Sequence, residues 1–322
     1  MKIISAEEAH AALSYPALID ALQEAFAKHF NQPPRQVFML DEADDNVDAF
    51  ALLPAWNDEV IAVKAFTYFP SNVPPFDLLY SKIMIFDRLH GEPLALVDGT
   101  TCTFWRTGGV SGLATRLLSR EDSSTLLLLG TGNLSTYMIR ANASVRSLKK
   151  IMVWGNPDGL PSVAGAQAVI DRMSTELPEI ELSVATDLES ACGAADIIVC
   201  ATASPDILVR GDWIKEGTHL DFIGNHHADK RECNTAVITK GKVYVDSYVN
   251  AFKEAGEILL PIEEGVFQKT DVVAELAEMC SGKATLRTDD KEITVFKAIG
   301  QALTDLVAAS MAYSASESAD QA

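Results

Sequence analysis

The sequence predicts an α/β protein of two domains, one of which contains a parallel sheet of the Rossmann type. Its 322 residues exceed the usual size of a single hydrophobic core. Residues 35–98 have the alternating pattern of successive strands, whereas strands and helices alternate from residue 125 onward. The strands of this second region are almost entirely apolar, which is typical of a parallel sheet covered on both faces.

The first region is expected to begin with helices and to continue as antiparallel strands. Ser5 and Glu8 have the spacing of a capping box that opens a short helix. Residues 16–30 carry apolar side chains at helical spacing. A turn at His90-Gly91 suits a hairpin. The expected strands are Gln36–Leu40, Phe50–Ala55, Ile61–Phe69, Leu79–Phe86 and Pro93–Val97.

The second region follows a helix that is expected over Thr103–Leu118. Further helices are expected from about Asn133 and Ser162, and a final one over Thr294–Ala312. The small, polar tail SASESADQA is expected to fray. The strands expected here are Thr125–Leu129, Ile151–Trp154, Leu182–Val184, Ile197–Cys200, Leu220–Ile223 and Val243–Val245.

Composition excludes several classes of protein. With 48% hydrophobic and 22% charged residues the chain is not disordered, and its net charge of −19 disfavours nucleic acid and anionic membranes as partners. Neither a signal peptide nor a membrane-spanning run is evident. The five cysteines lack Cys-x-x-Cys spacing, and Cys192 and Cys200 lie in apolar stretches. Inert core thiols and a cytoplasmic location are therefore expected.

The segment LLLLGTGNLS predicts a dinucleotide site. An apolar strand leads into Gly130-Thr131-Gly132, and a helix follows. Gly130 permits the tight turn, and Gly132 lets the backbone approach a pyrophosphate at the helix N-terminus. Asn133 and Leu134 begin that helix and are expected beside the phosphates. An ordinary strand-to-helix turn that uses glycine for its backbone freedom is the alternative.

Two further strand ends are candidates for contact with the cofactor. Asn156 follows the second strand, where an acidic residue would hold a ribose hydroxyl or an arginine a 2′-phosphate. Asp158 is the nearest acid, but it suits a turn or a helix cap better. NAD versus NADP therefore stays open. Thr202 and Ala203 follow the fourth strand, where small residues let a cofactor cross the edge of the sheet; a plain exit from strand to loop is the alternative.

Three stretches in this order resemble the ornithine cyclodeaminase/μ-crystallin family. The first is Asp98-Gly99 with FWRTGGVSGLA at 104–114, and the second is GTG at 130–132. The third is EITVFKAIG at 292–300, continuing to Asp305-Leu306. DWIKEGT at 212–218 and AGE at 255–257 also look like blocks of the family, so that the resemblance covers nearly the whole chain.

This resemblance implies a domain arrangement and an assembly. Residues 1–118 and 300–322 would form a dimerisation and substrate domain, into which a Rossmann domain of residues 119–299 is inserted. It also implies a homodimer or a dimer-based oligomer, an NAD(P)H cofactor and a small imino-acid or amino-acid substrate. Thr107 and Lys297, which lie within the matching stretches, are expected at the cofactor.

Three cations are candidate substrate ligands. The resemblance gives Arg106 the role of binding a carboxylate, which a guanidinium does through two parallel hydrogen bonds; a structural ion pair with Asp98 is the alternative. Alternation places Lys64 on an apolar strand face, and burial would lower its pKa, whereas a snorkelling surface lysine is the alternative. Arg35 resembles a further carboxylate ligand but could equally be a solvated loop residue.

The loop that follows the fifth strand departs from the cyclodeaminase pattern. Cyclodeaminases carry an aspartate that handles the substrate amino group, and counting back from Glu232 that position falls on His226. An imidazole could donate a hydrogen bond or a proton near a C=N nitrogen. It could equally cap the next helix. His226, His227 and Cys233 fit no zinc spacing, so no metal is expected.

These residues together predict reduction of a cyclic imino acid. Δ1-Pyrroline-2-carboxylate or Δ1-piperideine-2-carboxylate would give L-proline or L-pipecolate, with Arg106, Lys64 and Arg35 holding the carboxylate. Three alternatives remain: an ornithine cyclodeaminase, an alanine-type amino-acid dehydrogenase, and a μ-crystallin-like protein that binds NAD(P)H with little turnover.

Overall fold

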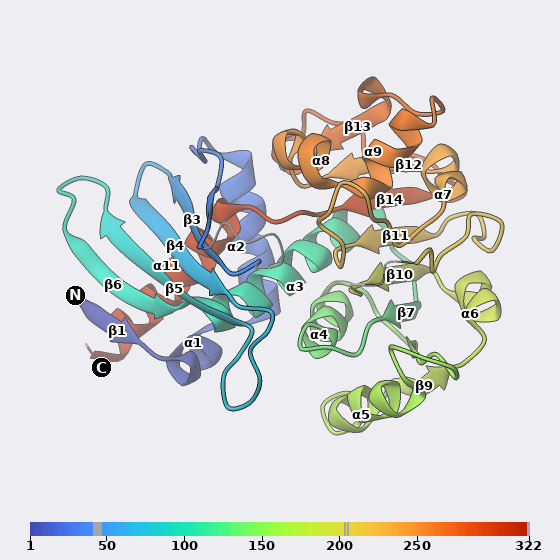
Figure 1. The fold of residues 1–322 in the computed structure, drawn as a ribbon, viewed down its shortest axis with the longest axis horizontal. Coiled ribbons are helices and arrows are strands. Elements are labelled where there is room, and N and C mark those ends of the chain that lie inside the picture. The colour runs from blue at the N-terminus through green and yellow to red at the C-terminus, as the bar shows by residue number, and fades with distance from the viewer. Residues whose placement is uncertain (41–46, 203, 205, 321–322) are drawn as a thin grey trace. The chain divides into compact units, whose positions relative to one another are not determined.

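The chain folds into two compact units (Figure 1). The computed structural model describes residues 1–40, 47–202, 204 and 206–320. The first unit comprises Met1–Arg106 and Gln301–Ala322, and the second comprises Thr107–Gly300. The chain therefore leaves the first unit inside helix α3 (Gly99–Leu118), twelve residues earlier than the boundary expected after residue 118. The chain returns to the first unit at Gln301, one residue later than expected.

A six-stranded sheet forms the centre of the first unit. Its order is β1-β6-β5-β4-β3-β2, antiparallel except for the parallel pair β1–β6. Antiparallel pairing between β5 and β6 and a positive φ of 72° at Gly91 agree with the expected hairpin. The bounds are β1 Lys2–Ile4, β2 Gln36–Met39, β3 Ala49–Trp56, β4 Val60–Tyr68, β5 Leu79–Asp87 and β6 Pro93–Asp98.

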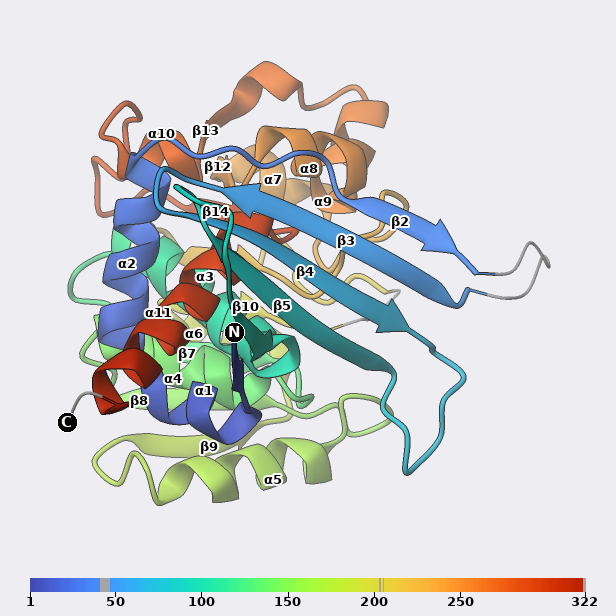
Figure 2. The same ribbon diagram turned by 90° about the vertical axis from the view of Figure 1, so that its left-hand side faces the viewer.

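Besides the start of α3, the described part of this unit contains the helices α1 (Ala6–Ala12), α2 (Tyr15–Ala27) and α11 (Ala302–Asp320). The capping box is confirmed, because the Ser5 hydroxyl accepts from the Glu8 N–H at 3.2 Å and the Glu8 carboxylate accepts from the Ser5 N–H at 2.7 Å. Helix α11 packs against β3, β4 and β5, and in Figure 2 it is seen to the left of these strands, next to α2. Every second residue of β3 is therefore buried.

The final helix begins later and ends later than the sequence predicts, at Ala302 and Asp320. Thr294–Lys297 is not helical but forms strand β14, and all of its side chains are buried in the second unit. Gly300, at a φ of 101°, lies between this strand and α11. The tail does not fray through residue 320, because Lys2 pairs with Glu317 and donates to the Ser316 carbonyl at 3.2 Å.

An eight-stranded parallel sheet forms the second unit, in the order β13-β12-β14-β11-β10-β7-β8-β9. Starting from β7, the strands run outward through β8 and β9 on one side and β10 and β11 on the other, which is the order of a doubly wound dinucleotide fold. The bounds are β7 Thr125–Leu129, β8 Lys150–Trp154, β9 Glu181–Ala185, β10 Ile197–Cys200, β11 His219–Phe222, β12 Lys242–Val245 and β13 Val272–Glu275.

Helices cover both faces of this sheet, and alternate strand residues enter two separate cores. Leu127 and Leu129 belong to one apolar cluster, and Leu126 and Leu128 to the other. No helix in the described ranges combines the length and apolar character needed to cross a membrane. The helices are α4 Ser135–Val145, α5 Val163–Ser174, α6 Leu188–Ala194, α7 Thr235–Lys240, α8 Tyr248–Glu254, α9 Gly256–Glu263 and α10 Leu276–Cys280, with a 3₁₀ turn at Lys269–Asp271.

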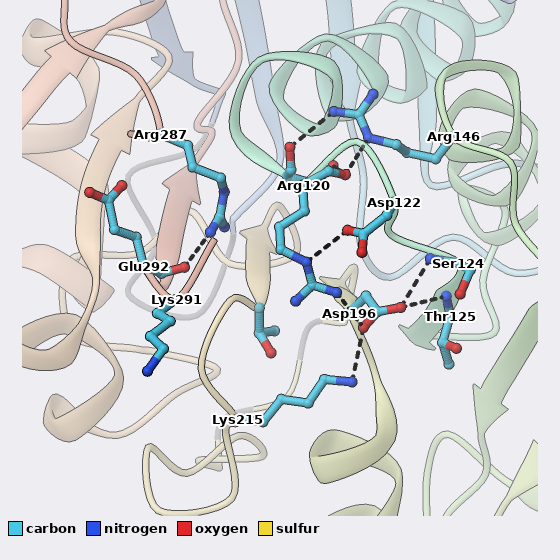
Figure 3. A network of polar contacts seen from close by, with 12 residues as sticks. Arg120, Asp122, Ser124, Thr125, Arg146, Asp196, Lys215, Arg287, Lys291 and Glu292 are labelled. Carbon is cyan, nitrogen blue, oxygen red and sulfur yellow. Dashed lines mark hydrogen bonds and ion pairs between the residues drawn. The ribbon is translucent and has the colours of Figure 1, made fainter. Parts of the chain in front are cut away.

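A buried carboxylate connects two neighbouring strands at the amino edge of the parallel sheet (Figure 3). Asp196, just before β10, accepts from the N–H groups of Ser124 and Thr125 at the start of β7, each at 3.0 Å. Arg120 at 3.2 Å and Lys215 at 2.9 Å balance its charge. These contacts hold the pKa of Asp196 below its usual value although burial opposes them, so the ion pairs keep the carboxylate charged.

Candidate active site

Lys64 brings a buried ammonium group into the first unit. It lies on β4 opposite Leu53 and Ile83, and only 4% of its surface is exposed. Its Nζ donates to the Thr103 hydroxyl at 2.6 Å and to the Asp305 carboxylate at 3.2 Å. Burial lowers the pKa of Lys64, while the charge of Asp305 opposes this shift. The alternative of a snorkelling surface lysine is excluded.

Arg106 shares the carboxylate oxygen that Lys64 uses. Its Nε donates to Oδ1 of Asp305 at 3.2 Å, and 13% of its side chain is exposed. Asp98, the partner considered from the sequence, instead accepts from Lys82 at 2.8 Å, because Lys82 lies directly opposite it on β5. The carboxylate partner of Arg106 in the structure is thus Asp305.

Asp305 is the member of this group to which the sequence assigned no role. It lies on α11 and is 1% exposed, and in the sequence it stood out only as part of the third family-like stretch. Lys64, Arg106, Asp305 and Thr103 together form what we call the cation cluster. It holds two cations and one carboxylate, so its formal charge is positive. Such a cluster suits an incoming carboxylate.

Arg35 lies just before β2, half-buried. Strand β2 pairs with β3 only from Gln36, which lies opposite Leu52, and β3 in turn pairs with β4, the strand that carries Lys64. The contact of Arg35 with substrate stays a prediction.

The turn between β7 and α4 has the geometry of a phosphate site in the second unit. Gly130 has a φ of 132°, and a Cβ there would lie 2.5 Å from the Ala201 carbonyl oxygen. A Cβ on Gly132 would meet nothing within 4 Å, so open space adjoins this backbone. Helix α4 has no acid in its first turn, and its described residues show no side-chain cap. These features fit a pyrophosphate.

Asn156 lies after β8, at the expected ribose position. Its side-chain oxygen accepts from the Asp158 N–H at 3.0 Å, and its own N–H donates to the Pro161 carbonyl at 2.6 Å. Ser162, not Asp158, caps α5. Asn156 is thus fixed by the loop itself, and Asp158 is exposed in a turn.

Thr202 follows β10, and its N–H and hydroxyl both donate to Glu232. Thr107, on α3, is 8% exposed. Ala203 lies outside the described residues. These positions remain predicted cofactor contacts, as do Asn133 and Leu134.

Lys297 and His226 both contact other residues of the second unit. Lys297 is 1% exposed, pairs with Glu257 at 2.9 Å and donates to the Asn225 carbonyl. It therefore holds the loop after β11, and the prediction that it touches the cofactor stays untested. His226 is exposed on that loop and stacks on His227, with ring centroids 4.8 Å apart.

Cys192 and Cys200, the two cysteines expected to be inert, are buried in an apolar core cluster of the second unit. Burial raises the pKa of Cys192 to about 12 and that of Cys200 well above its usual value. Both thiols therefore stay protonated, as expected of inert core residues.

A doubly wound parallel sheet, with a glycine turn where its order reverses, defines a Rossmann-type dinucleotide-binding protein. The chain belongs to the ornithine cyclodeaminase/μ-crystallin family, whose model matches residues 1–320. The resemblance predicted from the three sequence stretches is thereby confirmed, as is the α/β fold class.

Individual relatives are similar over nearly the full chain. A Δ1-pyrroline-2-carboxylate reductase of Colwellia psychrerythraea is 46% identical over 312 residues, covering 96% of this chain and 97% of the relative. The structure of the Thermococcus litoralis Δ1-pyrroline-2-carboxylate reductase with NADH and L-proline has a TM-score of 0.90 at 30% identity, covering 99% and 98% of the two chains. An archaeal alanine dehydrogenase dimer with bound NAD has a TM-score of 0.89 at 26% identity, covering 99% and 97%.

Proposed function

We propose that this protein is an NAD(P)H-dependent oxidoreductase that reduces Δ1-pyrroline-2-carboxylate to L-proline. The observation that carries the proposal is the cation cluster, in which Lys64 and Arg106 share one buried oxygen of Asp305. A cyclic imino acid presents one carboxylate beside its C=N bond, and this cluster offers a matching positive charge. The 46% identity to a reductase of this substrate supports the same assignment.

The chain's own residues position the substrate. Arg106 and Lys64 bind the carboxylate, and Arg35 is proposed to add a third contact; together they fix the orientation of C2. When bound, the reduced nicotinamide supplies a hydride. A protonated imine that accepts a hydride at C2 becomes the secondary amine and needs no further proton. Orientation therefore supplies most of the rate enhancement, and no strong base is required.

The cofactor is proposed to bind along the carboxyl edge of the parallel sheet. The N-terminus of α4, with Gly130, Gly132, Asn133 and Leu134, would hold the pyrophosphate. Asn156 would meet the adenosine ribose. Thr107, Thr202, Ala203 and Lys297 complete the predicted set of contacts.

A screen of substrates tests this function directly. NADH and NADPH oxidation would be followed at 340 nm with Δ1-pyrroline-2-carboxylate, Δ1-piperideine-2-carboxylate, and pyruvate with ammonia. We expect turnover with the cyclic imino acids. Turnover with pyruvate and ammonia alone would indicate the alanine-type dehydrogenase, and cofactor binding without turnover of any imine would indicate a μ-crystallin-like ligand-binding protein.

L-Ornithine should not be deaminated. His226 stands where a cyclodeaminase carries an aspartate, and an imidazole supplies no fixed negative charge to take protons from the substrate amine. The wild-type protein incubated with L-ornithine and catalytic NAD should therefore release neither ammonia nor proline. Proline formed at a rate comparable with imine reduction would establish the lyase instead. His226→Asp should keep the fold and change imine reduction more than NADH affinity.

We further propose a homodimer formed through the face of the six-stranded sheet opposite to the one that carries Lys64. Pro54, Val63, Met84 and Leu96 make one row across β3, β4, β5 and β6 on this face, and each is partly exposed. A row of apolar side chains suits burial against a second copy. Static light scattering should give about twice the chain mass, and Val63→Glu should lower it to that of one chain.

The free thiols suit a reducing compartment, so we propose that the enzyme acts in the cytoplasm.

A further inference from the structure

Glu232 bridges two loops at the carboxyl edge of the parallel sheet. One of its carboxylate oxygens accepts from the Thr202 N–H at 2.9 Å and from the Thr202 hydroxyl at 2.6 Å, on the loop after β10. The other accepts from the Gly224 N–H at 3.1 Å, on the loop after β11. Glu232 is fully buried, so it contributes nothing to the solvated surface.

The two loops touch through their backbones where Glu232 joins them. A Cβ on Gly224 would lie 1.9 Å from the Thr202 carbonyl oxygen and 2.7 Å from Glu232. Glycine is therefore required at 224 for this approach. The contact explains how one carboxylate reaches N–H groups on both loops.

A second layer fixes Glu232 and the far side of the loop after β11. Glu257, in the first turn of α9, accepts from the Glu232 N–H at 3.1 Å and pairs with Lys297 at 2.9 Å. Lys297 donates to the carbonyl of Asn225, the residue before His226. Glu232, Glu257 and Lys297 thus form a chain of contacts, which we call the edge clamp.

We propose that the edge clamp is a positioning device that holds Thr202 and the loop carrying His226 in register for cofactor binding and hydride transfer. The proposal rests on the proposed function, because one of its readouts is imine reduction. Burying three charged groups is a poor way to gain stability alone, since apolar side chains of similar volume do so at lower cost. Burial also raises the pKa of Glu232 to about 7, although Lys297 and the Thr202 donors oppose that shift.

Glu232→Gln tests the clamp with little change in volume. The amide keeps one acceptor oxygen but turns an NH₂ group toward the second loop, so one of the two N–H groups loses its partner. We expect NADH affinity, measured by calorimetry, to fall about 10-fold, and kcat for Δ1-pyrroline-2-carboxylate to fall by a similar factor. KM for the imine should change less than about 3-fold, because its carboxylate ligands belong to the cation cluster.

Asp196→Asn is the matched control. Asp196 is also a buried carboxylate that accepts two backbone N–H groups and faces cations, but it lies at the amino edge of the same sheet (Figure 3). We expect it to lower the melting temperature about as much as Glu232→Gln while leaving NADH affinity and kcat near wild type. Equal NADH affinity and equal kcat in the two variants would overturn the proposal.

Glu232→Asp keeps the test decisive where the glutamine variant does not fold. Aspartate retains both acceptor oxygens on a shorter arm, so NADH affinity and kcat should lie between wild type and the expected glutamine values; wild-type values of both would overturn the clamp. Should the wild-type protein reduce no imine, the proposed function fails. A selective loss of NADH affinity in the Glu232 variant would still support the clamp.

Discussion

Arg106→Ala should lower kcat/KM for Δ1-pyrroline-2-carboxylate by a factor of about 30 to 5,000, equivalent to about 2–5 kcal/mol. Arg106 is the more exposed cation of the cation cluster, and its Nε is fixed by Asp305 at 3.2 Å. Its removal lowers the formal charge of the cluster by one, which leaves Lys64 and Asp305 to cancel each other. A substrate carboxylate would then meet no net positive charge.

The effect should divide between KM and kcat. KM should rise because the carboxylate loses a charge-assisted hydrogen bond. kcat should fall because the carboxylate also orients C2, and a substrate that is less firmly held reaches the reactive geometry less often. NADH affinity should stay near wild type, since the predicted cofactor contacts lie in the second unit.

Arg120→Ala provides a control of matched burial. Arg120 has 18% of its side chain exposed, against 13% for Arg106, and it also pairs with carboxylates, those of Asp122 and Asp196 (Figure 3). It should lower stability without changing kcat/KM. Wild-type kinetics in Arg106→Ala would mean that Arg106 is structural and that another residue binds the carboxylate.

Local sequence signals were sufficient for much of the fold. Strand β7 and strand β10 have the predicted bounds, because each is a largely apolar run preceded by a polar residue and followed by a small one. Strand β14 was mistaken for the start of the last helix. Thr294–Lys297 has apolar side chains compatible with either structure, and its place between β11 and β12 is a long-range property that four residues cannot reveal. The three-residue β1 and the edge strand β13 were missed for the same reason.

The individual site residues were easier to predict than their partners. The alternation of the strand was enough to predict that Lys64 is buried, and the glycine spacing was enough to locate the turn at Gly130. Asp305 lies 241 residues from Lys64, and its contact exists only because α11 packs on β4. Glu232 likewise acts through Thr202, 30 residues away. Pairing across such distances depends on tertiary packing, which a single sequence does not encode in any local pattern.

Gly132→Val should weaken the affinity for NADH by a factor on the order of 100 or more while leaving the protein folded. A Cβ at this position meets nothing within 4 Å, so the protein's own packing leaves open space where the side chain would begin. The same space is where a pyrophosphate would approach the N-terminus of α4, and the valine would fill it. Circular dichroism should therefore give a near-native melting curve, whereas calorimetric titration with NADH should give no measurable heat.

Gly130→Val separates loss of binding from loss of folding. Its backbone φ of 132° is unfavourable for any side chain, and its Cβ would lie 2.5 Å from the Ala201 carbonyl oxygen on the neighbouring strand exit. This variant should lose both stability and NADH binding, so the pair distinguishes a glycine needed by the fold from one needed by the ligand. If Gly132→Val bound NADH with wild-type affinity, the pyrophosphate could not lie at this turn, and the cofactor site would have to be sought at another strand end.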